Sequence, residues 1–121
     1  MKDKTMQHYK IERTGRSPFS FNGECIGCGS TKTVSGSGSN RWTTVDIYKT
    51  VGGKFVAAIT NHTMWEGEHD YTKAWTAADA QAVIDNLKDE SGKFGRASQE
   101  ALEHAAEASP EFAAAYVETV D

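Results

Sequence analysis

The stretch RWTTVDIYKTVGGKFVAAIT, residues 41–60, decides the fold of this chain. Its two runs rich in Thr, Val, Ile, Tyr and Phe, residues 41–50 and 55–60, are separated by Val-Gly-Gly-Lys. β-Branched and aromatic side chains favour strands, and the two glycines can adopt the positive φ angles that a tight turn requires. The stretch therefore predicts a β-hairpin.

The residues on either side of this hairpin predict further strands. Residues 7–13 alternate weakly in polarity, and residues 19–25 carry aromatic or small side chains at every second position, with the segment TGRSP as a turn between them. Residues 70–75 alternate Tyr, Lys and Trp with smaller side chains. We therefore expect residues 1–75 to form an antiparallel meander of four or five strands.

Residues 27–40 interrupt this pattern. They are almost entirely Gly, Ser, Thr, Lys and Cys, a composition that buries little apolar area and weakens any regular element. We expect a long exposed loop here, or a hairpin with a mobile tip.

After residue 75 the apolar period changes from that of a strand to that of a helix. Thr76 places a capping hydroxyl three residues before the carboxylate of Asp79. A helix that starts at this cap and docks on the sheet is expected. Its apolar face would consist of Ala80, Val83, Ile84 and Leu87.

Two more helices are expected at the C-terminal end. Residues 97–108 are rich in Ala and Glu, and Ser109-Pro110 marks another start, with the serine as N-cap and the proline in the first helical position. This last helix should run to about residue 119. At 121 residues the chain suits one α+β domain, with a sheet in residues 1–75 and an acidic helical part in residues 76–121.

The charge divides at the same place. Residues 1–75 contain ten Lys or Arg and seven Asp or Glu, and residues 76–121 contain three and ten, so net charges of +3 and −7 sum to −4. Such asymmetry indicates a partner-binding surface, and without a complete catalytic motif we expect a non-enzymatic protein. The apolar runs are too short for a membrane span or a signal peptide, which predicts a cytoplasmic protein without membrane contact.

The acidic helices provide the main candidate for a binding site. Glu100, Glu103 and Glu107 follow i, i+3, i+7 spacing and therefore share one helix face. Such a ridge could occupy the Lys- and Arg-rich groove of a nucleic-acid-binding complex, or it could be a solvated face that keeps the protein soluble. The candidate partner-binding residues are Asp89, Glu90, Glu100, Glu103, Glu107 and Glu111.

A second hypothesis is a zinc site. Cys25 and Cys28 have CxxC spacing, and His62 and His69 could complete a Cys2His2 set, although their spacing of seven exceeds the usual range. The same CxxC spacing serves redox dithiols, but residues 29–32 begin no obvious helix that would activate the first thiol. Two incidental thiols are the simplest alternative, and no other cofactor is indicated.

Residues 62–70 (HTMWEGEHD) form the densest cluster of titratable groups, with two imidazoles and three carboxylates. They could act as a general acid and base or bind a divalent metal. As plain structure they would be a polar connection between strands, with Trp65 over the sheet edge. A catalytic triad would have to form in space, because no nucleophile is placed beside a histidine by the sequence itself.

A third hypothesis is single-stranded nucleic-acid binding through the sheet. Aromatic side chains would stack on bases and basic ones would contact phosphates. The acidic tail opposes this interaction, and direct nucleic-acid binding is therefore disfavoured. The residues concerned are Trp42, Tyr48, Phe55, Trp65, Tyr71 and Trp75, with Arg41, Lys49, Lys54 and Lys73.

Three motifs in the middle third of the chain carry a resemblance. They are Arg41-Trp42, the hairpin YKTVGGK at residues 48–54 and TMWEGEHD at residues 63–70, followed by an acidic helix to about Leu87. This pattern resembles small, mostly uncharacterised bacterial proteins, and it implies no activity or site. In size and charge alone, the chain is also similar to phage- or plasmid-borne inhibitors of host defence, including anti-CRISPR proteins.

Together these features lead us to expect a binding protein, an inhibitor carried by a mobile element, that acts on a basic protein surface through its acidic helices. It would be a monomer or a homodimer. In the second case two copies would pair through an exposed edge strand such as residues 41–50.

Overall fold

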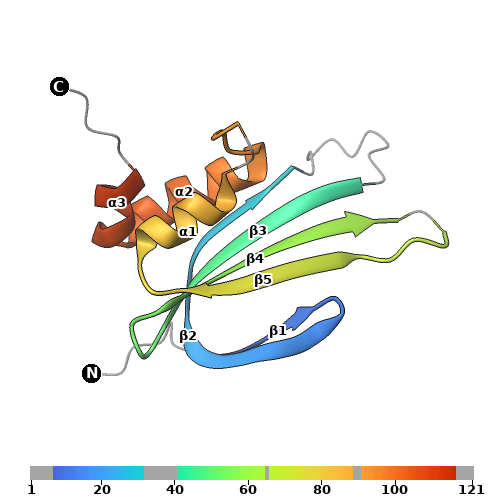
Figure 1. Ribbon diagram of the computed structural model, residues 1–121, viewed down its shortest axis with the longest axis horizontal. Coiled ribbons are helices and arrows are strands. Elements are labelled where there is room, and N and C mark those ends of the chain that lie inside the picture. The colour runs from blue at the N-terminus through green and yellow to red at the C-terminus, as the bar shows by residue number, and fades with distance from the viewer. Residues whose placement is uncertain (1–6, 32–40, 65, 89–90, 117–121) are drawn as a thin grey trace.

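The computed structural model describes residues 7–31, 41–64, 66–88 and 91–116. Five antiparallel strands form one sheet in chain order, and three helices follow them (Figure 1). This arrangement confirms the predicted α+β meander. The elements are β1 (Gln7–Arg13), β2 (Arg16–Ser30), β3 (Arg41–Thr50), β4 (Phe55–Thr63), β5 (Tyr71–Ala77), α1 (Ala80–Leu87), α2 (Arg96–Ala108) and α3 (Pro110–Tyr116).

The expected loop at residues 27–40 is wrong in its first part, because β2 continues to Ser30. Gly27 and Gly29 pair with β3, and their missing side chains let α2 approach β2 closely. A Cβ at Gly27 would collide with the Ala101 carbonyl oxygen, and one at Gly29 would collide with that of Ala97. Glycine marks a helix contact here, not a loop. Residues 32–40 lie outside the described part of the chain.

Of the predicted helix caps, one lies at a different residue and one lacks its side-chain hydrogen bond. Thr76 belongs to β5, and Asp79 is the N-cap of α1, accepting a hydrogen bond from the Ala82 backbone nitrogen at 2.9 Å. Ser109 is the C-cap of α2 and also directly precedes α3, where its carbonyl oxygen accepts from the Ala113 backbone nitrogen at 3.0 Å, as expected of an N-cap residue. Among the described residues its buried hydroxyl has no hydrogen-bond partner, so the side-chain part of the cap is absent. Pro110 does begin α3.

The expectation that Arg41–Thr50 forms an exposed edge is also wrong. This strand is β3, the central strand of the sheet, and it pairs with β2 on one side and β4 on the other. Both of its backbone edges are therefore occupied, and it cannot pair two copies of the chain.

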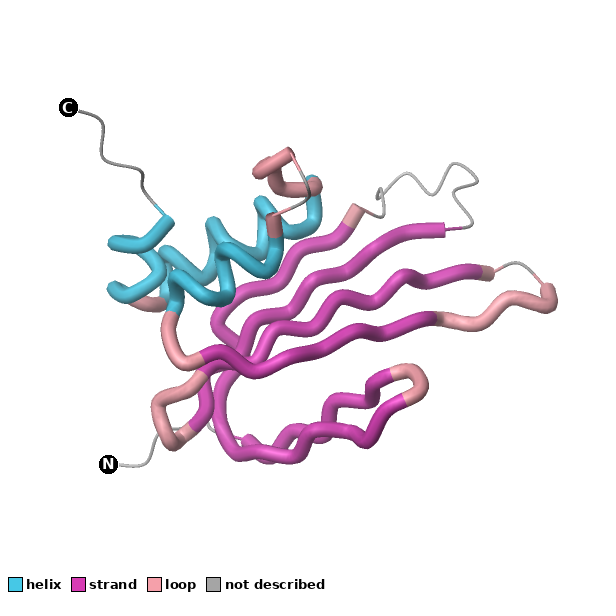
Figure 2. Tube along the Cα trace, viewed as in Figure 1, coloured by secondary structure: helices cyan, strands magenta, loops and turns pink. Residues whose placement is uncertain are grey.

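The three helices cover one side of the sheet, which we call the helix-side face (Figure 2). Alternation along the strands directs Val45 and Ile47 of β3 and Phe55 and Ala57 of β4 to this face, where all four are buried. Burying each of the larger side chains contributes about 1.5–3 kcal/mol. From the helices the core receives Val83, Ile84, Leu87, Leu102 and Phe112.

The β1–β2 hairpin lies on the opposite side of β3–β5, away from the helices (Figure 1). We call this the hairpin-side face. At the hairpin tip, the Thr14 backbone nitrogen donates to the Thr72 carbonyl oxygen at 3.0 Å, which joins the tip to β5. Near its base, the Tyr9 ring lies 5.6 Å from that of Phe21 and 4.7 Å from that of Tyr48. The hairpin thus folds back over the sheet and shields part of this face.

Candidate functional site

A β-bulge in β2 brings both cysteines to the hairpin-side face. Cys25 pairs with Tyr48 and Gly27 pairs with Ile47, so β2 has one residue more than β3 at this point. In a regular strand, residues three apart point to opposite faces. The extra residue reverses this alternation, and Cys25 and Cys28 therefore share a face.

Helix α2 lies along the end of β2 and adds two side chains to this region. A Glu100 carboxylate oxygen accepts a hydrogen bond from the Ser30 backbone nitrogen at 2.9 Å. One turn later, His104 Nδ1 lies 4.0 Å from Cys28 Sγ. A groove of about 380 Å³ opens between these groups and the side chains of Thr44 and Asp46 on β3.

His104 is a residue that the sequence did not single out. It lies 76 positions from Cys28, and no spacing rule joins a histidine in an Ala- and Glu-rich helix to a CxxC segment. The contact depends on the docking of α2 against Gly27 and Gly29, two residues whose surrounding composition predicted a loop.

Burial changes the acid–base behaviour of the hairpin-side face. Burial raises the pKa of Asp46, and a smaller effect of His62 opposes it. Burial, followed by the negative charge of Asp46, raises the pKa of both Cys25 and Tyr48. The Cys25 thiol also donates a hydrogen bond to the Gly27 carbonyl oxygen at 3.6 Å. Cys25 and Tyr48 are therefore held in their protonated forms at neutral pH.

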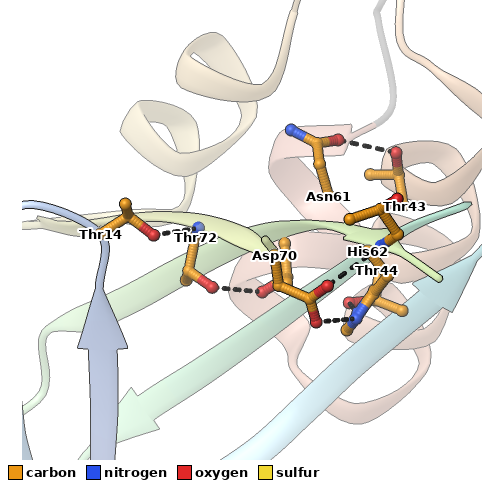
Figure 3. A network of polar contacts seen from close by, with 9 residues as sticks. Thr14, Thr43, Thr44, Asn61, His62, Asp70 and Thr72 are labelled. Atoms are coloured by element: carbon orange, nitrogen blue, oxygen red, sulfur yellow. Dashed lines mark hydrogen bonds and ion pairs between the residues drawn. The ribbon is translucent and has the colours of Figure 1, made fainter. Parts of the chain in front are cut away.

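His62 connects three segments through a hydroxyl–imidazole–carboxylate relay (Figure 3). Its Nε2 lies 3.0 Å from the Thr44 hydroxyl, and its Nδ1 lies 3.0 Å from an Asp70 carboxylate oxygen. The carboxylate accepts a hydrogen bond from Nδ1–H, so in the neutral ring Nε2 accepts a hydrogen bond from the Thr44 hydroxyl. The other Asp70 oxygen accepts from the Thr63 backbone nitrogen at 3.0 Å. The Trp42 ring stacks on His62 with centroids 4.9 Å apart.

This relay falls within residues 62–70, the cluster that the sequence identified, but Thr44 joins it only through the pairing of β3 and β4. It can move a proton between a hydroxyl and a carboxylate, which is the chemistry of a general base. Hydrogen bonds from the Thr63 backbone and from His62 lower the pKa of Asp70, so the carboxylate stays charged. A role in acid–base chemistry stays a prediction.

The four predicted zinc ligands do not come together. Cys25 and Cys28 lie on β2, His62 lies on β4 with β3 between them, and His69 lies in the exposed segment before β5. Both ring nitrogens of His62 are already hydrogen-bonded. Within the described residues, no group of three or more His, Cys, Asp or Glu side chains is placed to hold a metal ion.

The predicted acidic residues have different environments. Glu103 and Glu107 are exposed on the outer side of α2, whereas Glu100 is exposed but lies beside Gly29 of β2. Glu100 is bound to the Ser30 backbone, and Glu111 of α3 forms an ion pair with Lys49 at 3.4 Å. In the described part of the chain, Glu103 and Glu107 form no ion pair. Asp89 and Glu90 lie outside the described residues.

The aromatic side chains proposed to stack on bases do not form one platform. Phe55 is fully buried on the helix-side face, Tyr48 packs against Tyr9 and Phe21 on the other face, and Trp75 is packed against the helical core. Tyr71 is 48% exposed. Trp65 lies outside the described residues.

No helix in the described part of the chain is long and apolar enough to cross a membrane. No protein-family model, no curated protein and no solved structure matches this sequence. The resemblances noted for residues 41–87, and for size and charge, therefore stay predictions.

Proposed function

We propose that this chain is a non-enzymatic binding protein that engages a Lys- and Arg-rich protein surface through the outer side of α2. One observation carries the proposal: Glu103 and Glu107 are exposed on one side of a docked helix and form no ion pair within the described residues. Their carboxylates are free to pair with a partner's cations. Glu100 lies at the β2 side of α2, where it binds the Ser30 backbone.

The packing of α2 supports this use. The backbone of α2 contacts β2 at Gly27 and Gly29, and the apolar side of the helix buries Leu102 and Ala105. A helix held in this way presents its outer carboxylates in a fixed arrangement, which reduces the entropy lost on binding. The net charge of −7 in residues 76–121 would also steer a basic partner toward this side of the molecule.

The more specific form of the proposal is a mobile-element inhibitor that meets its partner in the cytoplasm. The partner would be the basic groove of a nucleic-acid-processing complex, such as a CRISPR effector, and the acidic helix would compete with nucleic acid for that groove. The charge division and the likeness in size and charge support this form. Direct binding of nucleic acid by the same acidic surface is disfavoured by repulsion.

A charge-reversal experiment tests the proposal. The variant Glu103→Lys/Glu107→Lys is compared with Glu12→Lys/Glu66→Lys, which makes the same change in net charge at exposed positions away from α2. Glu100 is left intact because its reversal would also release the end of β2. Both proteins and the wild type are used to capture partners from host lysate, followed by mass spectrometry and affinity measurement.

We expect a Lys- and Arg-rich protein that the wild type and the Glu12/Glu66 variant retain and that the α2 variant loses by at least roughly tenfold in affinity. Added nucleic acid should displace it if the groove interpretation is correct. Equal capture by all three proteins would refute the α2 surface.

A further inference from the structure

We propose that Cys28 and His104 form a reactive thiol–imidazole pair, at which hydroperoxides oxidise Cys28 reversibly to a sulfenic acid. This inference concerns a modification site and does not depend on the proposed binding surface. It differs from the zinc hypothesis because its second residue is His104, and it requires no metal ion.

The first support is the geometry of the pair. Cys28 Sγ lies 4.0 Å from His104 Nδ1, at the outer limit for a hydrogen bond to sulfur, and both side chains are exposed. The thiolate is the form of cysteine that reacts, so a base in contact with the thiol promotes the reaction. The groove of about 380 Å³ in front of the pair leaves room for a small peroxide.

The second support is the contrast with Cys25, which lies on the same face three residues earlier. Its thiol donates to the Gly27 carbonyl oxygen, and it has no histidine contact in the described structure. Burial and the charge of Asp46 raise its pKa, which favours the unreactive thiol form. The chain therefore contains two exposed cysteines in unlike surroundings, and Cys25 is an internal reference for Cys28.

The reaction balances with a hydroperoxide as the only oxidant. His104 accepts the thiol proton, the Cys28 sulfur attacks the terminal peroxide oxygen, an S–O bond forms and the O–O bond breaks. The leaving alkoxide, or hydroxide from hydrogen peroxide, takes the proton from His104. The products are Cys28 sulfenic acid and an alcohol or water. Two equivalents of a small thiol restore Cys28, with release of one disulfide and water.

Single-thiol variants test the proposal. Cys25→Ser retains only Cys28, and Cys28→Ser retains only Cys25. Each is treated with hydrogen peroxide in the presence of dimedone, which traps sulfenic acid, and adduct formation is followed by intact mass and peptide mapping. His104→Gln and the control His69→Gln are then added to the Cys25→Ser protein. Both histidines are exposed, and His69 lies outside the groove.

We expect Cys28 to react at least roughly tenfold faster than Cys25, a modest share of what a positioned general base supplies. His104→Gln should slow Cys28 to about the rate of Cys25, whereas His69→Gln should leave it unchanged. Omitting dimedone and adding dithiothreitol should return the oxidised protein to its original mass. Equal rates for the two thiols, or no effect of His104→Gln, would overturn the proposal.

Discussion

The two faces of strands β3–β5 differ in composition. The helix-side face is apolar, with Val45, Ile47 and Phe55 buried beneath the helices. The hairpin-side face has a smaller buried apolar set, Tyr48, Val56, Ala58 and Ala74. It also carries Asp46 and His62 with threonine hydroxyls, and the hairpin covers it only in part (Figure 1). Because one face supplies most of the buried apolar area, the other can hold polar and titratable groups that would cost stability in a closed core.

The largest predicted effect comes from removing one aromatic ring on each face. Phe55→Ala deletes a fully buried ring that packs edge-on against Phe112, with the two ring centroids 5.0 Å apart. This change should lower the free energy of unfolding by about 3–5 kcal/mol. Phe21→Ala deletes a half-buried ring beside Tyr9 and Tyr48, and should cost about 1–2 kcal/mol. Urea unfolding followed by circular dichroism measures both. Equal losses would mean that the hairpin side contributes as much to stability as the helix side.

A smaller effect is expected where α2 meets β2. Gly29→Ala forces a methyl group into the Ala97 carbonyl oxygen and should cost about 1–3 kcal/mol, because helix or strand must move. Gly52→Ala is the matched control, since its nearest neighbour would lie 3.9 Å away, and it should change stability by less than about 0.5 kcal/mol. A tolerated Gly29→Ala would show that the helical layer sits more loosely than the structure indicates. The Cys28–His104 contact should weaken in the Gly29 variant, with slower oxidation as the readout.

These two comparisons show what the sequence could and could not predict about the fold. The β3–β4 hairpin follows from its alternation and its Gly-Gly turn, and the apolar stripe of α1 follows from helical spacing. Both signals are local. The loop predicted from residue 27 onward was wrong at Gly27 and Gly29, because composition does not distinguish a glycine needed for close packing from one that makes a loop flexible.

In the candidate sites, too, local features could be predicted from sequence and contacts between distant residues could not. The shared face of Glu103 and Glu107 was predictable because a helix repeats locally. The Cys28–His104 contact was not, because it requires the β2 bulge, the end of β2 and the docked position of α2 at once. Only part of the His62 relay could be predicted from sequence, because Asp70 lies nearby in the chain but Thr44 comes from another strand.

The attachment of the helical layer can be tested at its first residue. Asp79→Ala removes the 2.9 Å capping hydrogen bond to the Ala82 backbone nitrogen and should cost about 1 kcal/mol. Thr76→Ala, the change at the residue that the sequence suggested as a cap, should alter stability by less than about 0.5 kcal/mol, because that side chain is exposed on β5. Thermal unfolding of both variants separates the two assignments. A larger loss of stability for Thr76→Ala than for Asp79→Ala would show that Thr76 is the cap, as the sequence predicted.

The smallest effects should appear in the pH dependence of stability, and two carboxylates near His62 should act with opposite signs. The lowered pKa of Asp70 means that its stabilising contribution is complete above the ordinary value near 4 and is lost as the pH falls below it. The raised pKa of Asp46 means that the folded state binds its proton more tightly than the unfolded state does. Its charge therefore opposes folding at neutral pH, and this penalty is relieved as the pH falls toward about 4.

Two isosteric variants separate these contributions. Asp70→Asn should reduce stability at neutral pH and flatten the acid side of the stability curve, whereas Asp46→Asn should increase stability at neutral pH and leave it unchanged in acid. Urea midpoints measured from about pH 3 to about pH 7 provide the test. If Asp46→Asn destabilises the protein at neutral pH, the charged carboxylate must be stabilised by favourable contacts. The polar groups of the hairpin-side face would then contribute to folding stability themselves, and would not merely be tolerated because the helix-side core is stable.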